Sequence, residues 1–127
     1  MNLAVNFDNE KLTGMVYCAG IMPIRPIKST KSDFLHETML INYYAFVEAV
    51  RLYADKRVSN GGSIVVMSSY SSINGDKGQL AYSASKSAID SSVVVMSKEL
   101  YSKNIRVNAI RPAIIQGEDT NIELLPV

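Results

Sequence analysis

A phenol, an ammonium and a hydroxyl in this sequence have the spacing of a proton-transfer site. Tyr82 and Lys86 are four positions apart, so a helix would place both on one face, one turn from each other. A free phenol is a poor acid or base at neutral pH, and a nearby cation favours its ionised form. Ser69, thirteen residues before Tyr82, follows an apolar run that predicts a buried strand. Together the three groups could hydrogen-bond a substrate oxygen and exchange a proton with it while a hydride moves.

Alternating strands and helices are expected to position these groups. The apolar runs predict strands over residues 15–18, 63–67 and 105–110. Helices are expected from Thr30 or Ser32, as the capping residue, to about residue 56, and from about 82 to 102. The run Asn60-Gly61-Gly62 is expected to break the chain before the second strand, and residues 1–13 fit either a helical remnant or coil. Such alternation favours a parallel sheet.

The second helix is apolar on more than one face. Its run over residues 93–96 would favour a strand by propensity, but the length of the segment and the Tyr82–Lys86 register favour a helix. A helix that is apolar on several sides is buried on several sides. We therefore expect one side to pack on the sheet and another to pack on a second subunit, which predicts a homo-oligomer formed through the two long helices.

Five segments of the chain resemble, in order and spacing, the short-chain dehydrogenase/reductase family. They are residues 16–20, residue 42, residues 62–69, residues 82–86 and residues 105–112. The resemblance implies an α/β fold: a partial Rossmann-like doubly wound parallel sheet, with about three strands and two long helices and without the first βαβ half. It also implies one partial NAD(P)-binding domain over residues 1–127, the catalytic middle of the family fold.

The resemblance implies a role for four side chains. In such enzymes Tyr82 would be the general acid/base, Lys86 would favour its ionised form and bind the nicotinamide ribose, and Ser69 would polarise the substrate oxygen. Asn42 would bend its helix and relay protons through a water molecule. The implied reaction is hydride transfer between NAD or NADP and a small-molecule carbonyl or secondary alcohol.

The remaining expected cofactor contacts come from the small residues Ala19 and Gly20 and from Ile115. Two departures weaken this cofactor site. Tyr17-Cys18 stands where the family has two asparagines, so their side-chain hydrogen bonds are expected to be lost, and Gly117 stands where the family has a threonine.

A third departure is larger. The family opens with a Gly-x-x-x-Gly-x-Gly turn that holds the dinucleotide pyrophosphate, and this sequence contains none. We therefore expect the chain by itself to bind NAD or NADP poorly. The alternative function is a non-catalytic truncated remnant, or a subunit that only packs with others.

Each proposed site residue also has an ordinary structural interpretation. Tyr82 fits an amphipathic tyrosine at a helix start, and Lys86 a solvated helix lysine. Ser69 lies in a serine cluster typical of turns, and Asn42 fits a packing asparagine.

Composition adds few constraints. The net charge of +1 gives no indication of nucleic acid or membrane partners, and no apolar run approaches the ~20 residues that span a bilayer. The single cysteine, Cys18, permits no internal disulfide and favours a cytoplasmic location. No cluster of residues resembles a metal site.

Overall fold

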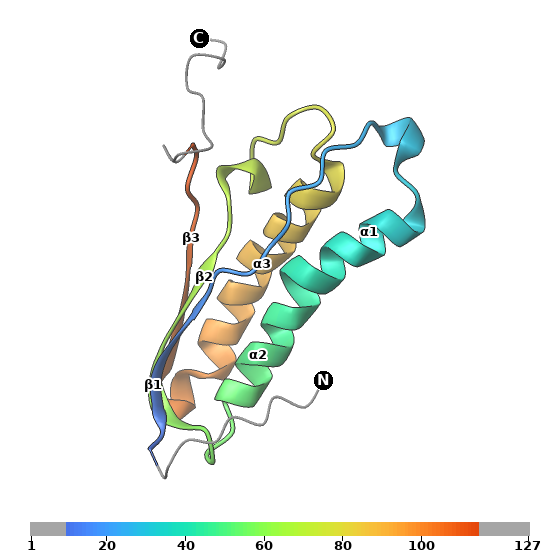
Figure 1. The fold of residues 1–127 in the computed structure, drawn as a ribbon. Coiled ribbons are helices and arrows are strands. Elements are labelled where there is room, and N and C mark those ends of the chain that lie inside the picture. The colour runs from blue at the N-terminus through green and yellow to red at the C-terminus, as the bar shows by residue number, and fades with distance from the viewer. Residues whose placement is uncertain (1–9, 115–127) are drawn as a thin grey trace.

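The computed structural model describes residues 10–114, which form a three-stranded parallel sheet in the order β1-β2-β3. Helices cover one face of this sheet (Figure 1). The strands are β1 (Leu12–Tyr17), β2 (Ser59–Met67) and β3 (Ile105–Ile110), and the helices are α1 (Ser32–Met39), α2 (Ala45–Tyr53) and α3 (Leu80–Glu99). The predicted α/β architecture with a partial parallel sheet is therefore confirmed, with each strand within a few residues of its predicted range.

The first long helix is interrupted. A π-helical turn, Leu40–Tyr44, joins α1 to α2, whereas the sequence predicted one continuous helix. The predicted cap is also wrong: the residue before α1 is Lys31, without a side-chain cap, and the Thr30 hydroxyl lies 3.0 Å from the Pro26 carbonyl instead. A threonine beside a proline-rich loop bonds that loop because its short side chain reaches nearby carbonyls.

The strand Ser59–Met67 includes the run predicted to break the chain. Leu12 pairs with Ser59 and Gly14 with Ser63, so β2 carries extra residues between these pairs. Gly61 and Gly62 both have φ +124°, a backbone conformation that other residues rarely adopt. The glycines thus form a bulge within the strand rather than an end to it.

The core lies between the sheet and the helices. Alternate residues of the strands point towards the helices, because side chains alternate across a strand. The buried side chains come from both layers and are Ile64, Val66, Ile105, Val107, Phe46, Val50, Tyr53 and Ile89. Burying each large apolar side chain contributes about 1.5–3 kcal/mol to the free energy of folding. These buried side chains therefore hold the helices against the sheet.

The long helix α3 exposes part of its apolar surface. Val93 and Met96 pack against the core, while Val94 and Val95 are 55% and 52% exposed. The segment is helical as predicted, because its position over the sheet outweighs the strand propensity of its valines. Its burial against a second subunit stays a prediction.

The register of the strands places the loops that follow them side by side. Tyr17 pairs with Val66, and Val66 pairs with Ala109, so the carboxyl ends of all three strands lie at one edge of the sheet. Ligand sites of open parallel sheets lie at this edge. Of the residues predicted to carry chemistry, Ala19, Gly20 and Ser69 follow β1 and β2 and Tyr82 and Lys86 lie near the start of α3, whereas Asn42 lies in the π-helical turn.

Candidate active site

Asn42 is fully buried in the π-helical turn and holds the loop after β1. Its Nδ2 donates to the Ile21 carbonyl at 2.9 Å, and its Oδ1 accepts from the Ile21 N–H at 2.8 Å. The same Nδ2 also donates to the Ser85 hydroxyl at 2.9 Å. Both Nδ2 hydrogens and one lone pair of Oδ1 are therefore used by protein partners, and the side chain joins the β1 loop to α3.

Tyr17 stabilises the turn that carries Asn42. The Ala45 N–H donates to Leu40, five residues back, instead of to Ile41, which is the π-helical pattern. The Ile41 carbonyl accepts from the Tyr17 hydroxyl at 2.8 Å. Tyr17 thus supplies a side-chain hydrogen bond of its own at this strand end, because its long side chain reaches the carbonyl that the π turn leaves free. The loss of the asparagines' hydrogen bonds stays a prediction.

Lys86 is 5% exposed and lies behind the end of β2. Its Nζ donates to the Met67 carbonyl at 2.6 Å and lies 5.6 Å from the centre of the Tyr82 ring, a cation–π distance. Burial lowers the pKa of Lys86, since the charged form loses hydration, and the nearby Asp90 partly opposes this. The structure thus brings Tyr82 and Lys86 together as the spacing predicts.

The backbone around Tyr82 is held by Ser85. The Ser85 hydroxyl is fully buried, accepts from Asn42 and donates to the Tyr82 carbonyl at 2.7 Å. Sequence reasoning missed this residue, although its place three residues after Tyr82 puts it near the same helix face. Asn42, Ser85 and Tyr82 form one chain of hydrogen bonds from the π turn to the phenol-bearing residue.

Ser69 is 7% exposed and directly follows β2 and Ser68. Its Oγ accepts a hydrogen bond from the Ser71 N–H at 3.1 Å and caps the short helical turn Tyr70–Ser72. A hydroxyl that accepts one bond retains its own proton to donate. Among residues 10–114 no hydrogen bond joins Ser69 to Tyr82.

Gly20 lies over the Asn42–Lys86 pair. A Cβ at this position would lie 3.4 Å from Asn42 Oδ1 and 3.5 Å from Lys86 Nζ, so the glycine keeps the backbone open beside the ammonium. Ala19 and Gly20 are both exposed. Ile115, the third predicted cofactor contact, lies outside the described residues, as does Gly117.

Asp90 is a further residue that the sequence did not suggest. It lies one turn after Lys86 on α3, and its Oδ2 accepts from Arg111 Nε at 2.7 Å. This ion pair connects α3 to the segment after β3. It also holds the Asp90 carboxylate near the buried Lys86. The i, i+4 spacing from Lys86 was the available signal.

Residues 10–114 contain no group of three or more His, Cys, Asp or Glu side chains placed to hold a metal ion. No helix of this part is long and apolar enough to cross a membrane.

Comparison with known proteins agrees with this geometry. Residues 3–122 match the family model described as enoyl-(acyl carrier protein) reductase. The chain therefore belongs to the short-chain dehydrogenase/reductase family.

Curated relatives support the same family. The chain is 33% identical over 124 residues to the oxidoreductase YgfF of Escherichia coli K12, which covers 93% of this chain and 50% of that protein. It is 30% identical over 106 residues to carbonyl reductase family member 4 of Danio rerio, covering 84% of this chain and 45% of that protein. The chain thus spans about half the length of the curated relatives it matches.

Solved structures give the same fold. A 4-hydroxyisoleucine dehydrogenase complexed with NADH and succinate matches with a TM-score of 0.78 and 30% identity, over 89% of this chain and 56% of that one. A 7α-hydroxysteroid dehydrogenase complexed with NADH and 7-oxo glycochenodeoxycholic acid matches with a TM-score of 0.73 and 28% identity, over 80% and 40%. Both are oxidoreductases.

Proposed function

We propose that this chain is the catalytic segment of an NAD(P)-dependent oxidoreductase that interconverts a small-molecule carbonyl compound and a secondary alcohol. In the direction of reduction, the Tyr82 hydroxyl protonates the substrate oxygen, and the Lys86 ammonium stabilises the phenolate that forms. Ser69 donates a hydrogen bond to the same oxygen as negative charge develops on it. A nicotinamide cofactor, when bound, supplies or accepts the hydride.

The observation that carries this proposal is the burial of Lys86 behind the Tyr82 ring. An ammonium at 5% exposure loses hydration, which a protein tolerates where the charge is used or fully compensated. Met67 supplies one acceptor for its three N–H donors. Lys86 is buried, lies close to the Tyr82 ring and is near the edge of a parallel sheet where ligands bind. This position supports a role in proton transfer and does not fit the ordinary interpretation of Lys86 as a solvated helix lysine.

The residues around Gly20 fit a dinucleotide. The absence of a side chain at Gly20 leaves the Lys86 Nζ approachable from the loop after β1, and Lys86 would donate to the nicotinamide ribose there. Ala19, Gly20 and Ile115 would complete the contacts. The related structures solved with NADH support a nicotinamide dinucleotide, NAD or NADP, as the cofactor class.

Asn42 supports this function by positioning. It holds the β1 loop through both polar atoms of the Ile21 backbone, which keeps Gly20 beside Lys86. A proton relay through a water at Asn42 is part of the proposal. So are a single partial NAD(P)-binding domain over residues 1–127, a cytoplasmic location, and a homo-oligomer formed through the two long helices.

The test is Tyr82→Phe in the longest native polypeptide that contains these residues. The phenyl ring keeps the packing but removes the proton, so kcat is expected to fall by about 10²–10⁴-fold with the affinity for NADH or NADPH retained. Turnover is measured with a panel of ketones and secondary alcohols, including cyclopentanol, on which a relative's name indicates activity.

Tyr70→Phe is the matched control, because Tyr70 is a 46%-exposed tyrosine one residue after Ser69. It is expected to leave kcat unchanged. Turnover near the wild-type rate in Tyr82→Phe would exclude the proposed mechanism, and loss of turnover in both variants would show that the effect of Tyr82→Phe is not specific.

A further inference from the structure

Asp90 and Arg111 form an ion pair that is partly hidden from solvent. Arg111 Nε lies 2.7 Å from Asp90 Oδ2, and the two side chains are 49% and 10% exposed. The second carboxylate oxygen, Asp90 Oδ1, is buried and has no hydrogen-bond partner among the described residues. Exposed ion pairs contribute little to stability, and a buried oxygen without a partner costs free energy. Folding stability therefore explains this pair poorly, and its place in the fold indicates another role.

The arginine belongs to a segment that two backbone hydrogen bonds tie to the loop after β2. The Ser68 N–H donates to the Ile110 carbonyl at 2.8 Å, and the Tyr70 N–H donates to the Pro112 carbonyl at 2.9 Å. The two donors flank Ser69, and the two acceptors flank the arginine of the ion pair. The backbone on both sides of Ser69 is therefore held by the end of β3 and the residues that follow it.

The same loop is also attached to α3. The Ser68 hydroxyl, on a residue that is 3% exposed, donates to the Lys86 carbonyl at 3.3 Å. Asp90 lies one turn after Lys86 on this helix. The contacts therefore close a ring, which runs from α3 through Ser68 to the end of β3 and returns from Arg111 to α3 through the ion pair.

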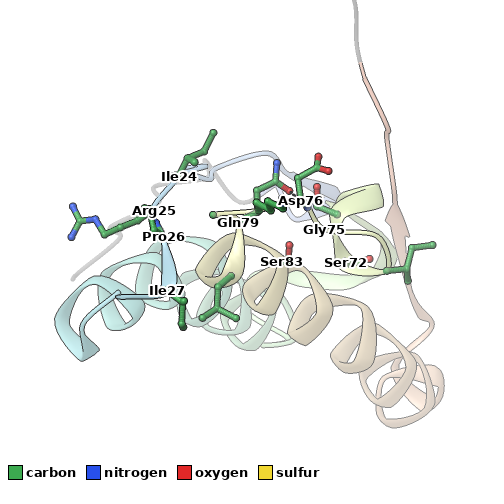
Figure 2. Close-up of a pocket in the computed structure, with 14 residues that line it drawn as sticks. Ile24, Arg25, Pro26, Ile27, Ser72, Gly75, Asp76, Gln79 and Ser83 are labelled. Carbon is green, nitrogen blue, oxygen red and sulfur yellow. Dashed lines mark hydrogen bonds between the residues drawn. The ribbon is translucent and has the colours of Figure 1, made fainter. Parts of the chain in front are cut away.

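The far end of the loop after β2 is held by other contacts. Figure 2 shows this part, with Gly75 and Asp76, where it lines a pocket of about 870 Å³ together with the loop after β1. There the Arg25 N–H donates to the Gly78 carbonyl at 2.9 Å. The two ends of the loop thus have separate attachments, and only the end that carries Ser69 belongs to the ring.

We propose that Asp90 and Arg111 are positioning residues for Ser69. The ion pair holds the segment after β3 against α3, and this segment holds the backbone on both sides of Ser69, so the Ser69 hydroxyl keeps its place at the sheet edge. The catalytic consequence rests on the proposed oxidoreductase function, in which Ser69 donates to the substrate oxygen. The alternative is a direct effect of Asp90 on Lys86, because burial lowers the pKa of Lys86 and the Asp90 carboxylate partly opposes this.

The structural step is tested by amide hydrogen exchange, followed by NMR on the ¹⁵N-labelled longest native polypeptide that contains these residues. Asp90→Ala is the first variant, because Arg111 is half exposed and water can hydrate its guanidinium once the carboxylate is gone. The amides of Ser68 and Tyr70 are expected to exchange about fivefold faster. The amide of Arg25, which bonds the other end of the loop, is expected to keep its wild-type rate.

Glu48→Gln is the matched control, because Glu48 forms an exposed ion pair with Arg51 on α2. It is expected to leave all of these exchange rates unchanged, since this pair makes no contact with the loop after β2 among the described residues.

Arg111→Met separates the two routes by which Asp90 could act. It breaks the ion pair but keeps the Asp90 carboxylate near Lys86. It is therefore expected to speed the exchange of the same two amides as Asp90→Ala does.

The catalytic consequence is measured as kcat. Asp90→Ala and Arg111→Met are each expected to lower kcat about tenfold, a smaller loss than the roughly 10²–10³-fold drop that follows removal of a direct donor. In a Ser69→Ala background, Asp90→Ala is expected to change kcat by less than about twofold, because the hydroxyl that the pair positions is already absent.

Three outcomes overturn the inference. The first is unchanged exchange of the two amides in Asp90→Ala. The second is wild-type exchange in Arg111→Met together with a loss of kcat in Asp90→Ala, which would show that Asp90 acts through Lys86. The third is a loss of kcat from Asp90→Ala that is as large in the Ser69→Ala background as in the wild type. If no variant and no wild type turns over, the proposed function fails, and the exchange rates still decide whether the pair holds the loop.

Discussion

Asn42 joins three parts of the chain through one side chain. Its partners are the backbone of Ile21 and the hydroxyl of Ser85, at distances of 2.8–2.9 Å. Asparagine in mid-helix is usually unfavourable because its side chain competes for backbone hydrogen bonds. Here the competition is resolved, since the side chain leaves its own helix and bonds a loop and a neighbouring helix.

Asn42→Ala is therefore expected to lower the free energy of unfolding by about 2 kcal/mol, because the Ile21 N–H and the Ser85 hydroxyl lose their partner in a buried position. Urea unfolding followed by circular dichroism measures this. Asn74→Ala, at an exposed asparagine in the loop after β2, is the control, with an expected change within about 0.5 kcal/mol. Equal stabilities of the two variants would show that the Asn42 network contributes little.

Lys86 makes the stability depend on pH. Burial lowers its folded-state pKa below the ordinary value of 10.5. Between the lowered pKa and 10.5 the unfolded chain binds more protons than the folded chain, so stability rises with pH across that interval. Below the folded-state pKa the cost of the buried charge is present in full.

Lys86→Met removes this dependence. The stability of the wild type relative to Lys86→Met is expected to increase as pH rises from neutral towards 10.5, measured by urea unfolding at several pH values. Lys98→Met, at an exposed lysine of the same helix, controls for the loss of a positive charge. A difference between wild type and Lys86→Met that falls with pH would contradict the burial effect.

At the scale of the elements, the bulge in β2 depends on two glycines that the neighbouring backbone approaches closely. A Cβ on Gly62 would lie 2.0 Å from the Thr13 carbonyl oxygen and 2.5 Å from Tyr53 Oη. The Tyr53 hydroxyl also donates to the Gly61 carbonyl at 2.8 Å. The bulge thus allows the end of α2, where Tyr53 lies, to pack closely against the beginning of β2.

Gly62→Ala is expected to lower the free energy of unfolding by about 3 kcal/mol, because it combines a steric clash with a backbone at positive φ. Gly14→Ala is the matched control: its Cβ would lie 3.4 Å from the Ser63 carbonyl oxygen, an ordinary contact, and the expected change is within about 1 kcal/mol. The variants are compared directly by their midpoints of thermal unfolding. A Gly62→Ala protein as stable as Gly14→Ala would show that the sheet accommodates the added methyl.

For the whole molecule, apolar side chains are exposed on two opposite sides. On the sheet face away from the helices, Val16 and Ile110 are 67% and 51% exposed, and on α3 Val94 and Val95 are similarly open. Within residues 10–114, β1 pairs only with β2, so its other edge presents backbone groups that can pair with another chain.

We therefore expect the 127-residue chain to self-associate, as measured by size-exclusion chromatography with light scattering. Val94→Lys/Val95→Lys is expected to reduce association through the helices, and Val16→Lys association through the sheet. The variant with the larger effect identifies the dominant surface. A monodisperse monomer for the unmodified chain would exclude both surfaces as interfaces under those conditions.

The sequence by itself determined the local features of this protein. The four-residue spacing of Tyr82 and Lys86 places them on one helix face whatever surrounds them, and apolar runs of strand length between helices define the parallel sheet. These signals depend only on neighbouring residues, so they are readable without knowledge of the packing.

Only the tertiary structure decided the contacts between distant residues. Tyr17 and Ile41 are 24 positions apart, and Asn42 and Ser85 are 43 apart. Nothing in either local sequence predicts that a π turn would leave the Ile41 carbonyl free or that Ser85 would be the partner of Asn42. Such hydrogen bonds form because packing the helices on the sheet buries polar groups, and buried polar groups must find partners wherever the fold places them.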